Sequence, residues 1–169
     1  PDTGATTEVA RGFAVLSWSS LGIGPDGTLL VADRDRDLID LPIGVHPYQR
    51  EKMAIRTQMP NAREARTFYE VTERYQGFCV IDARPQTGRT HQIRVHLQHT
   101  GHPILGDDRY GDEEANSQAR RLGLKRLFLH AQSIAFADES GNELHFTAPL
   151  ADDLQQFLEV GIPTIQGKR

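Results

Sequence analysis

The sequence predicts an α+β fold in which a mixed, mostly antiparallel sheet is accompanied by few helices. Two pairs of β-like segments carry this prediction. Residues 65–73 and 78–84 flank a Gln-Gly turn, and residues 127–137 and 143–147 flank a Ser-Gly-Asn turn. Such pairs are typical of antiparallel hairpins. Helical periodicity, by contrast, is confined to a few short segments.

The remaining elements follow in chain order. The short apolar runs at 11–19 and 28–32 lie on either side of a Gly-Pro-Asp-Gly turn and are predicted strands. Helices are predicted at about 90–100, at the polar, helix-prone segment 112–122, and at 150–160. The last of these is amphipathic, and its apolar positions in register are Leu150, Leu154, Phe157 and Leu158.

The predicted helix at 90–100 has recognisable ends. Thr90 is a suitable N-cap, because its hydroxyl can accept a hydrogen bond from a backbone amide two or three residues later. Gly101 stands where a C′ glycine would end the helix. Ile93 and Leu97 are four residues apart and therefore share an apolar face.

A neighbouring face of the same helix is polar and carries His91, Arg94 and Gln98. One interpretation is a solvated face of a surface helix, which is the usual reason for charges at helical spacing. The other is a surface turned toward an anionic partner or a buried carboxylate. The density of Arg, His and Gln over 88–97 favours the second interpretation.

Length and composition are those of one globular domain. The chain has 169 residues, of which 38% are hydrophobic and 25% are charged. It has no apolar run of about 18 residues that could span a membrane and no visible signal peptide. The single cysteine, Cys79, lies in a predicted strand and is interpreted as a buried small hydrophobe. These features predict a cytoplasmic protein, and we take it to be a monomer.

The charge is unevenly distributed along the chain. Residues 1–42 carry 3 basic and 7 acidic side chains, and residues 136–169 carry 2 and 6. Residues 43–135 carry 14 basic and 10 acidic side chains, within a chain of net charge −4. Either this is ordinary variation or it marks a local basic patch on an acidic protein.

Two other motifs point to cofactors or metals but lack the required context. The glycines at 22, 24 and 27 match a dinucleotide fingerprint, but a strand-like segment follows where a helix is needed. His96 and His99 are three residues apart, with no cysteine or carboxylate at ligand spacing. The sequence therefore predicts no cofactor and no metal.

The segment 88–97, which reads Gly-Arg-Thr-His-Gln-Ile-Arg-Val-His-Leu, and the following Gly-His-Pro-Ile-Leu-Gly-Asp-Asp-Arg-Tyr-Gly closely resemble the RluA-like family of RNA pseudouridine synthases. The segments 40–44, 64–71, 126–131 and 146–150 also resemble this family, in the family's order. The resemblance covers roughly residues 38 to 158. It implies part of the mixed-sheet catalytic domain of a pseudouridine synthase.

The resemblance also implies boundaries and partners. We expect an atypical N-terminal segment at 1–37, a partial synthase-like domain at 38–160 and a tail at 161–169. The family isomerises uridine to pseudouridine in RNA without a metal or other cofactor. The expected partner is therefore structural RNA, ribosomal or transfer RNA, and no membrane is expected to take part.

Site residues are implied in the same way. Arg94 matches the family's arginine that pairs with the nucleophilic carboxylate and is the implied catalytic residue. The resemblance further implies that Arg89, Thr90, His91 and Gln92 contact RNA phosphates or support the loop. Ile93 and Leu97 would pack the helix beneath Arg94.

The family's nucleophile lies in a His-Arg-Leu-Asp…Thr-Ser-Gly motif, and this sequence contains no such motif. The family's segment with a base-stacking tyrosine is also unmatched. Asp33, Asp35 and Asp37 are the acids that could instead fold into the pocket. No recognisable motif places an acid beside Arg94, so we expect Arg94 to face solvent with no carboxylate partner.

Three hypotheses remain open at this point. The chain is a fragment or diverged member of an RNA pseudouridine synthase, a non-catalytic RNA-binding module that retains the sheet, or a truncated product with no function of its own. The missing Asp motif favours the second or third hypothesis. A buried carboxylate against Arg94 would favour the first.

Overall fold

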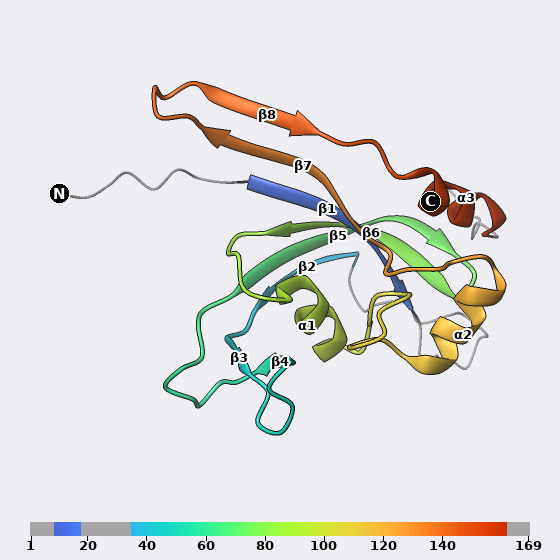
Figure 1. Ribbon diagram of the computed structural model, residues 1–169, viewed down its shortest axis with the longest axis horizontal. Coiled ribbons are helices and arrows are strands. Elements are labelled where there is room, and N and C mark those ends of the chain that lie inside the picture. The colour runs from blue at the N-terminus through green and yellow to red at the C-terminus, as the bar shows by residue number, and fades with distance from the viewer. Residues whose placement is uncertain (1–8, 18–34, 162–169) are drawn as a thin grey trace.

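The structure, a computed structural model, describes residues 9–17 and 35–161 (Figure 1). Its main sheet has six strands in the order β2-β5-β6-β1-β7-β8, and every neighbouring pair is antiparallel. Three helices accompany the sheet in the described residues. The predicted α+β class, with a largely antiparallel sheet, is confirmed. The bounds of the sheet strands are β1 (Val9–Ser17), β2 (Arg36–Asp40), β5 (Arg66–Tyr75), β6 (Phe78–Pro85), β7 (Leu129–Ala137) and β8 (Glu143–Thr147).

Both predicted hairpins are present. In β5–β6, Tyr75 pairs with Phe78 across a two-residue turn, and Gly77 adopts the positive φ of 88° that this turn needs. The β7–β8 hairpin pairs Ala137 with Glu143 and projects beyond the rest of the molecule (Figure 1). The alternation of side chains and the turn residues were sufficient to predict both.

The strand at the centre of the sheet comes from the N-terminal segment. β1 pairs with β6 on one side and with β7 on the other. Residues 9–17 therefore belong to the same sheet as the strands that follow residue 38. The predicted strand at 28–32 and the glycine fingerprint at 22–27 lie outside the described residues.

Two strands form a separate small sheet, β3 (Ile43–Val45) and β4 (Met53–Ile55), which we call the β3–β4 hairpin, residues 43–55. The hairpin lies at the lower edge of the molecule in Figure 1, beside α1 (Gln92–His99). This hairpin was not predicted, because each of its strands has only three residues and no clear alternation.

The other two helices match their predicted positions. α2 (Glu113–Arg121) begins at Asp112, whose carboxylate accepts a hydrogen bond from the backbone amide of Ala115 at 2.8 Å. α3 (Asp152–Val160) buries Leu154 and Phe157, two of the four apolar positions predicted for it. Among the described residues, no helix is both long and apolar enough to cross a membrane.

The core lies where β6 meets the helices. All six residues from Phe78 to Ala83 are buried, because the strand is central in the sheet and five of the six are apolar; the exception, Asp82, accepts hydrogen bonds from Arg84. Phe78, Phe128 and Phe157 pack together at one end, with ring centroids 5.3 and 5.9 Å apart. Cys79 is 3% exposed, and burial raises the pKa of its thiol to about 12, which confirms the interpretation of a buried hydrophobe.

Candidate functional site

The helix α1 begins one residue later than predicted. Its N-cap is His91, not Thr90, and no side chain caps the first turn. His91 has a φ of 56°, a left-handed conformation that is rare for a residue other than glycine. The prediction that Thr90 caps this helix was therefore wrong. A long-range contact of His91 overrides the local preference of threonine, as described below.

The other end of α1 is as predicted. Gly101 has a φ of 81°, and its amide donates to the carbonyl of Gln98 at 3.0 Å. The amide of His102 donates to the carbonyl of Leu97, also at 3.0 Å. This pair of hydrogen bonds is a Schellman motif, in which glycine tolerates the positive φ at C′. The motif ends the helix and turns the chain toward the Gly-Asp-Asp segment.

Gln92 is buried, with 4% of its surface exposed, and its amide is fully engaged within the protein. The Nε2 group donates to the carbonyl of Arg66 and the hydroxyl of Thr67. The Oε1 atom accepts from the hydroxyl of Thr87 and the amide of Arg89. Of the two roles expected for this residue, RNA contact and loop support, the geometry favours loop support.

Arg94 forms a two-point ion pair with Asp107. Its Nε donates to Oδ2 of Asp107 at 2.7 Å, and its Nη2 donates to Oδ1 at 2.8 Å. The Arg94 side chain is 19% exposed and the Asp107 side chain is 0% exposed. The prediction that Arg94 faces solvent without a carboxylate was therefore wrong. The acid comes from the Gly-Asp-Asp-Arg-Tyr-Gly segment, to which no local pattern in the sequence assigns a role.

Neighbouring groups of the protein use the hydrogen-bonding capacity of the Asp107 carboxylate. Besides Arg94, its Oδ1 accepts hydrogen bonds from the backbone amides of Arg109 and Tyr110, both at 2.9 Å. Burial alone would raise the pKa of Asp107, but the hydrogen bonds from Arg94, Tyr110 and Arg109 outweigh it and lower the pKa. The hydrogen bonds with Asp107 in turn raise the pKa of Arg94. Asp107 is thus a charged positioning group without access to solvent.

Tyr110 joins this ion pair to two other elements. Its ring lies 4.9 Å from the guanidinium carbon of Arg94, a cation–π distance. Its hydroxyl accepts a hydrogen bond from the amide of Met53 at 2.8 Å and lies 2.8 Å from Nδ1 of His91. The hydrogen bond between the Tyr110 hydroxyl and Nδ1 of His91 ties the start of α1 to the segment that carries Asp107.

The ionisation of His91 agrees with this geometry. Burial, with the nearby charges of Arg94 and Arg109, lowers the pKa of His91. A lowered pKa favours the neutral imidazole, and a neutral imidazole can share a hydrogen bond with the Tyr110 hydroxyl at Nδ1, as donor or as acceptor according to its tautomer.

A surface depression of about 650 Å³ opens over the Arg94–Asp107 pair. Basic side chains outnumber acidic ones around it. The basic residues are Lys52, Arg94, Arg109, Lys125 and Arg126, and the acidic residues are Glu51, Asp107 and Asp108. We call this the Arg94 depression. It lies within residues 43–135, the segment in which basic side chains outnumber acidic ones.

The other predicted site residues surround the start of α1. Arg89 is half-buried, and its Nε donates to the carbonyl of Glu64 at 2.9 Å, while Thr90 is exposed. Of the acids considered as relocated nucleophiles, Asp35 pairs with Arg74 at the surface and Asp37 lies in β2 opposite Tyr69. Asp33 lies outside the described residues. The charged partner that the structure places against Arg94 is therefore Asp107.

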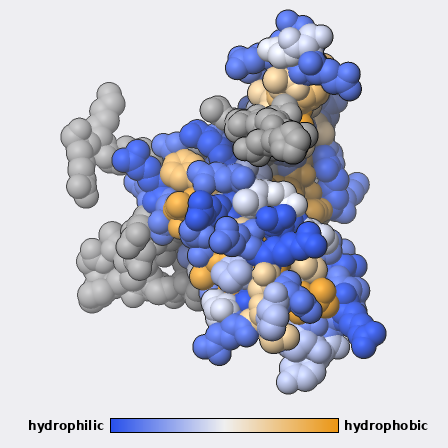
Figure 2. Space-filling view, turned by 90° about the vertical axis from the view of Figure 1, so that its left-hand side faces the viewer, coloured by the Kyte–Doolittle hydropathy of each residue, from blue (hydrophilic) through white to orange (hydrophobic). Residues whose placement is uncertain are grey.

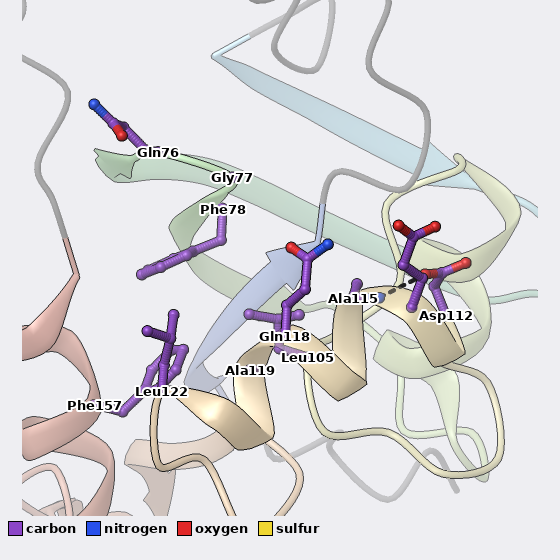
Figure 3. A pocket seen from close by; sticks show the side chains of 11 residues that line it. Gln76, Gly77, Phe78, Leu105, Asp112, Ala115, Gln118, Ala119, Leu122 and Phe157 are labelled. Atoms are coloured by element: carbon purple, nitrogen blue, oxygen red, sulfur yellow. Dashed lines mark hydrogen bonds between the residues drawn. The ribbon is translucent and has the colours of Figure 1, made fainter.

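A second cavity, of about 200 Å³, lies between α2 and the β5–β6 turn (Figure 3). Phe78, Leu105, Leu122 and Phe157 point toward it, with Gln118 and Asp112 at its polar side (Figure 3). None of the predicted site residues lines this cavity. Its walls offer no basic side chain to an anion, so we place the candidate site at the Arg94 depression.

The depressed pKa of Asp107 predicts a loss of stability in acid. A carboxylate whose pKa is lower in the folded than in the unfolded protein stabilises the fold above its unfolded pKa of about 4, and this contribution disappears as the pH falls through the folded pKa. We expect wild type to unfold at higher urea concentration than Asp107→Asn at pH 7. The difference should shrink steadily below about pH 4. A difference that stays constant with pH would contradict this role of Asp107.

Known proteins with sequences similar to this chain are RNA pseudouridine synthases. A family model described as RNA pseudouridylate synthase matches residues 27–99. A ribosomal large subunit pseudouridine synthase C of Vibrio parahaemolyticus is 46% identical over 100 residues, which are 59% of this chain and 32% of that protein. An uncharacterized RNA pseudouridine synthase of Chloroflexus aurantiacus is 43% identical over 121 residues, 71% of this chain and 36% of that protein. The chain spans about a third of the length of these relatives.

Solved structures show the same fold. The human RNA pseudouridylate synthase domain containing 1 superimposes with a TM-score of 0.71 at 22% identity, covering 96% of this chain and 62% of that one. The human RNA pseudouridylate synthase domain containing 4 superimposes with a TM-score of 0.66 at 24% identity. The match covers 90% of this chain and 62% of that one. At these identities the match shows a shared fold alone.

Proposed function

Because this chain contains part of an RNA pseudouridine synthase domain of the RluA-like family, we propose that it binds structural RNA, ribosomal or transfer RNA, through the Arg94 depression. We further propose that this depression is part of a uridine-isomerising site that is inactive in this chain unless another acid supplies the nucleophile. The observation that carries the proposal is the anchored guanidinium of Arg94 in a basic depression. Its hydrogen bonds to Asp107 use two of the five donors of the group, which leaves three for another acceptor. An RNA phosphate or a second carboxylate fits those donors.

Pseudouridine formation breaks the bond between uracil and ribose and rejoins the sugar to C5 of the base. The base has to leave its stack to reach a pocket, and the family uses an accessible carboxylate beside the arginine. Asp107 does not suit that task, since its side chain is 0% exposed and its oxygens accept four hydrogen bonds from the protein. We propose that Asp107 and Tyr110 position Arg94 and that the nucleophile is a different acid.

A non-catalytic RNA-binding module is the second candidate function. The saturation of Asp107 favours it, together with a sequence that lacks the His-Arg-Leu-Asp motif. The two candidates share the RNA partner and need no cofactor, and for both we propose a cytoplasmic location. They differ only in turnover.

RNA binding is expected to be weak and to depend on salt. Basic side chains that neutralise phosphates release counterions, so the logarithm of affinity falls with the logarithm of salt concentration. We expect Lys125→Glu, a change inside the Arg94 depression, to weaken binding of a uridine-containing RNA stem-loop several-fold and to lower the salt slope by about one. Titrations at two salt concentrations measure both effects.

Arg121→Glu is the matched control for this titration. It makes the same change in net charge at an exposed position at the end of α2, outside the lining of the depression. An equal loss of affinity in both variants would assign binding to overall charge and contradict a site at Arg94. No binding by wild type at low salt would contradict the proposed function itself.

Purified chain is expected to show little or no isomerisation of uridine in bulk ribosomal or transfer RNA. The reason is that, among the described residues, the carboxylate in an ion pair with Arg94 is that of Asp107, which is buried and already fully hydrogen-bonded. Robust turnover that survives simultaneous Asp33→Ala, Asp35→Ala and Asp37→Ala would show that the nucleophile lies elsewhere. Turnover lost in just one of the three single variants would identify a relocated nucleophile.

A further inference from the structure

We propose that the β3–β4 hairpin is an RNA-contacting arm, in which Tyr48 stacks on an unpaired base while Arg50 and Lys52 contact the neighbouring phosphates. The proposal rests on the proposed RNA-binding function and names a second surface for it. The proposed ligand of Tyr48 is an unpaired nucleotide of the same RNA that binds at Arg94.

Tyr48 is the most exposed of the large hydrophobic residues in the described part of the chain, with 91% of its surface accessible. A fully exposed aromatic ring forgoes the stabilisation that burial of its apolar surface would give. Flat aromatic faces in solvent are the surfaces on which proteins stack unpaired bases of RNA. The position of Tyr48 therefore suits a contact made with a partner outside this chain.

The loop that carries Tyr48 is held in place by its own hydrogen bonds. The amide of His46 donates to the carbonyl of Lys52 at 2.9 Å, and the amide of Lys52 donates to the carbonyl of Gln49 at 2.8 Å. Nδ1 of His46 accepts from the amides of Tyr48 and Gln49 at 3.3 and 3.2 Å. The His46 ring also contacts the Tyr48 ring edge-on, with centroids 6.3 Å apart. A preorganised loop of this kind loses little conformational entropy on binding.

The hairpin is fastened to the Arg94 site. The amide of Met53 donates to the Tyr110 hydroxyl at 2.8 Å, and Nη1 of Arg109 donates to the carbonyl of Glu51 at 2.7 Å. Buried Ile43 packs in a small core with Ala65, Val95 and Tyr110. The arm is therefore a rigid extension of the wall that supports Arg94.

Charged side chains connect the arm with the Arg94 depression. Lys52 and Arg109 line both the depression and a separate hollow of about 460 Å³ between the hairpin and α1, where His46 and His99 also lie. Between residues 46 and 56 the chain has three Lys or Arg side chains and one acidic side chain. Positively charged side chains, Lys52 and Arg109, therefore lie between Arg94 and Tyr48, where they could contact the phosphates of one RNA strand.

The chemistry of the arm favours RNA over a protein partner. The face that includes this hairpin is mainly hydrophilic, with small hydrophobic groups among the hydrophilic residues (Figure 2). Exposed Val45 and Met59 are the other large apolar residues of this region. Protein interfaces bury a core depleted of charge, whereas one aromatic ring flanked by cations matches a base with its phosphates.

The test compares Tyr48→Ala, Tyr48→Phe, Tyr48→Trp and Tyr48→Leu in the full chain. The probes are a labelled RNA stem-loop with unpaired uridines in its loop and a fully paired RNA duplex with the same stem. We expect Tyr48→Ala and Tyr48→Leu to weaken stem-loop binding on the order of tenfold, because stacking is lost. The Phe and Trp variants should bind as wild type does, and duplex binding and the salt slope should be unchanged in all four. Thermal unfolding should also be unchanged, since the side chain is exposed.

The outcomes separate the arm from the proposed function. Suppose that wild type binds RNA and that Lys125→Glu weakens binding but Tyr48→Ala does not. The proposal of an RNA-contacting arm would then be wrong, while the proposed function would stand. The hairpin would in that case be a candidate surface for a protein partner. Wild-type affinity in Tyr48→Leu would also overturn the arm, because an apolar contact would then replace stacking. Absence of RNA binding by wild type would overturn both proposals.

Discussion

Arg94→Ala is expected to lower the free energy of unfolding by about 3 to 5 kcal/mol. The substitution removes both hydrogen bonds that Arg94 donates to Asp107 and leaves that carboxylate buried without its charged partner. A buried carboxylate is costly when it is unpaired, and its amide donors from Arg109 and Tyr110 compensate only in part. Urea denaturation of the two proteins side by side at pH 7 measures the difference.

Arg126→Ala is the matched control for this prediction. It also removes a two-point arginine–aspartate pair, here with Asp153, but both side chains of that pair are about half exposed. Solvent screens an exposed pair, so its loss should change stability far less. Equal effects of the two substitutions would contradict the buried character of the Arg94–Asp107 pair. A third variant, Arg94→Lys, should recover only part of the loss, because an ammonium cannot make the two-point contact.

Gly106→Ala is expected to destabilise the fold by about 3 kcal/mol or more. Gly106 has a φ of 75°, and a Cβ at this position would lie 2.1 Å from the carbonyl oxygen of Arg126. Backbone cannot move aside as a flexible side chain can. The amide of Gly106 also donates to Oδ1 of Asn116 at 2.7 Å, and this bond helps to hold the loop that carries Asp107. Denaturation by urea, with circular dichroism as the probe, measures the loss.

Gly101→Ala separates the two causes of this loss. Gly101 has a similar φ of 81°, but a Cβ there would meet nothing within 4 Å. Its substitution should cost only the strain of the left-handed backbone, about 1 kcal/mol. If Gly106→Ala costs no more than Gly101→Ala, the close approach to Arg126 is not what requires glycine at position 106.

Local sequence patterns predicted the elements that depend on local interactions. The β5–β6 and β7–β8 hairpins follow from alternation and turn residues, and α3 follows from apolar positions at helical spacing. Gly101 ends α1 as predicted, since the left-handed cap is a local requirement. The short strands β3 and β4 were missed, because three residues hold too little pattern and their position is set by packing on Val95 and Tyr110.

The sequence by itself determined the fold class, the hairpins and the family resemblance, and it singled out Arg94 as the candidate site residue. Only the tertiary structure decided what Arg94 contacts. Asp107 lies 13 positions away along the chain, beyond the helix end and a loop, so no periodic pattern links the two residues. The same holds for His91, where the contact with Tyr110 replaces the expected Thr90 cap. Pairing between distant segments depends on how the loops return, and that is a property of the folded chain rather than of local spacing.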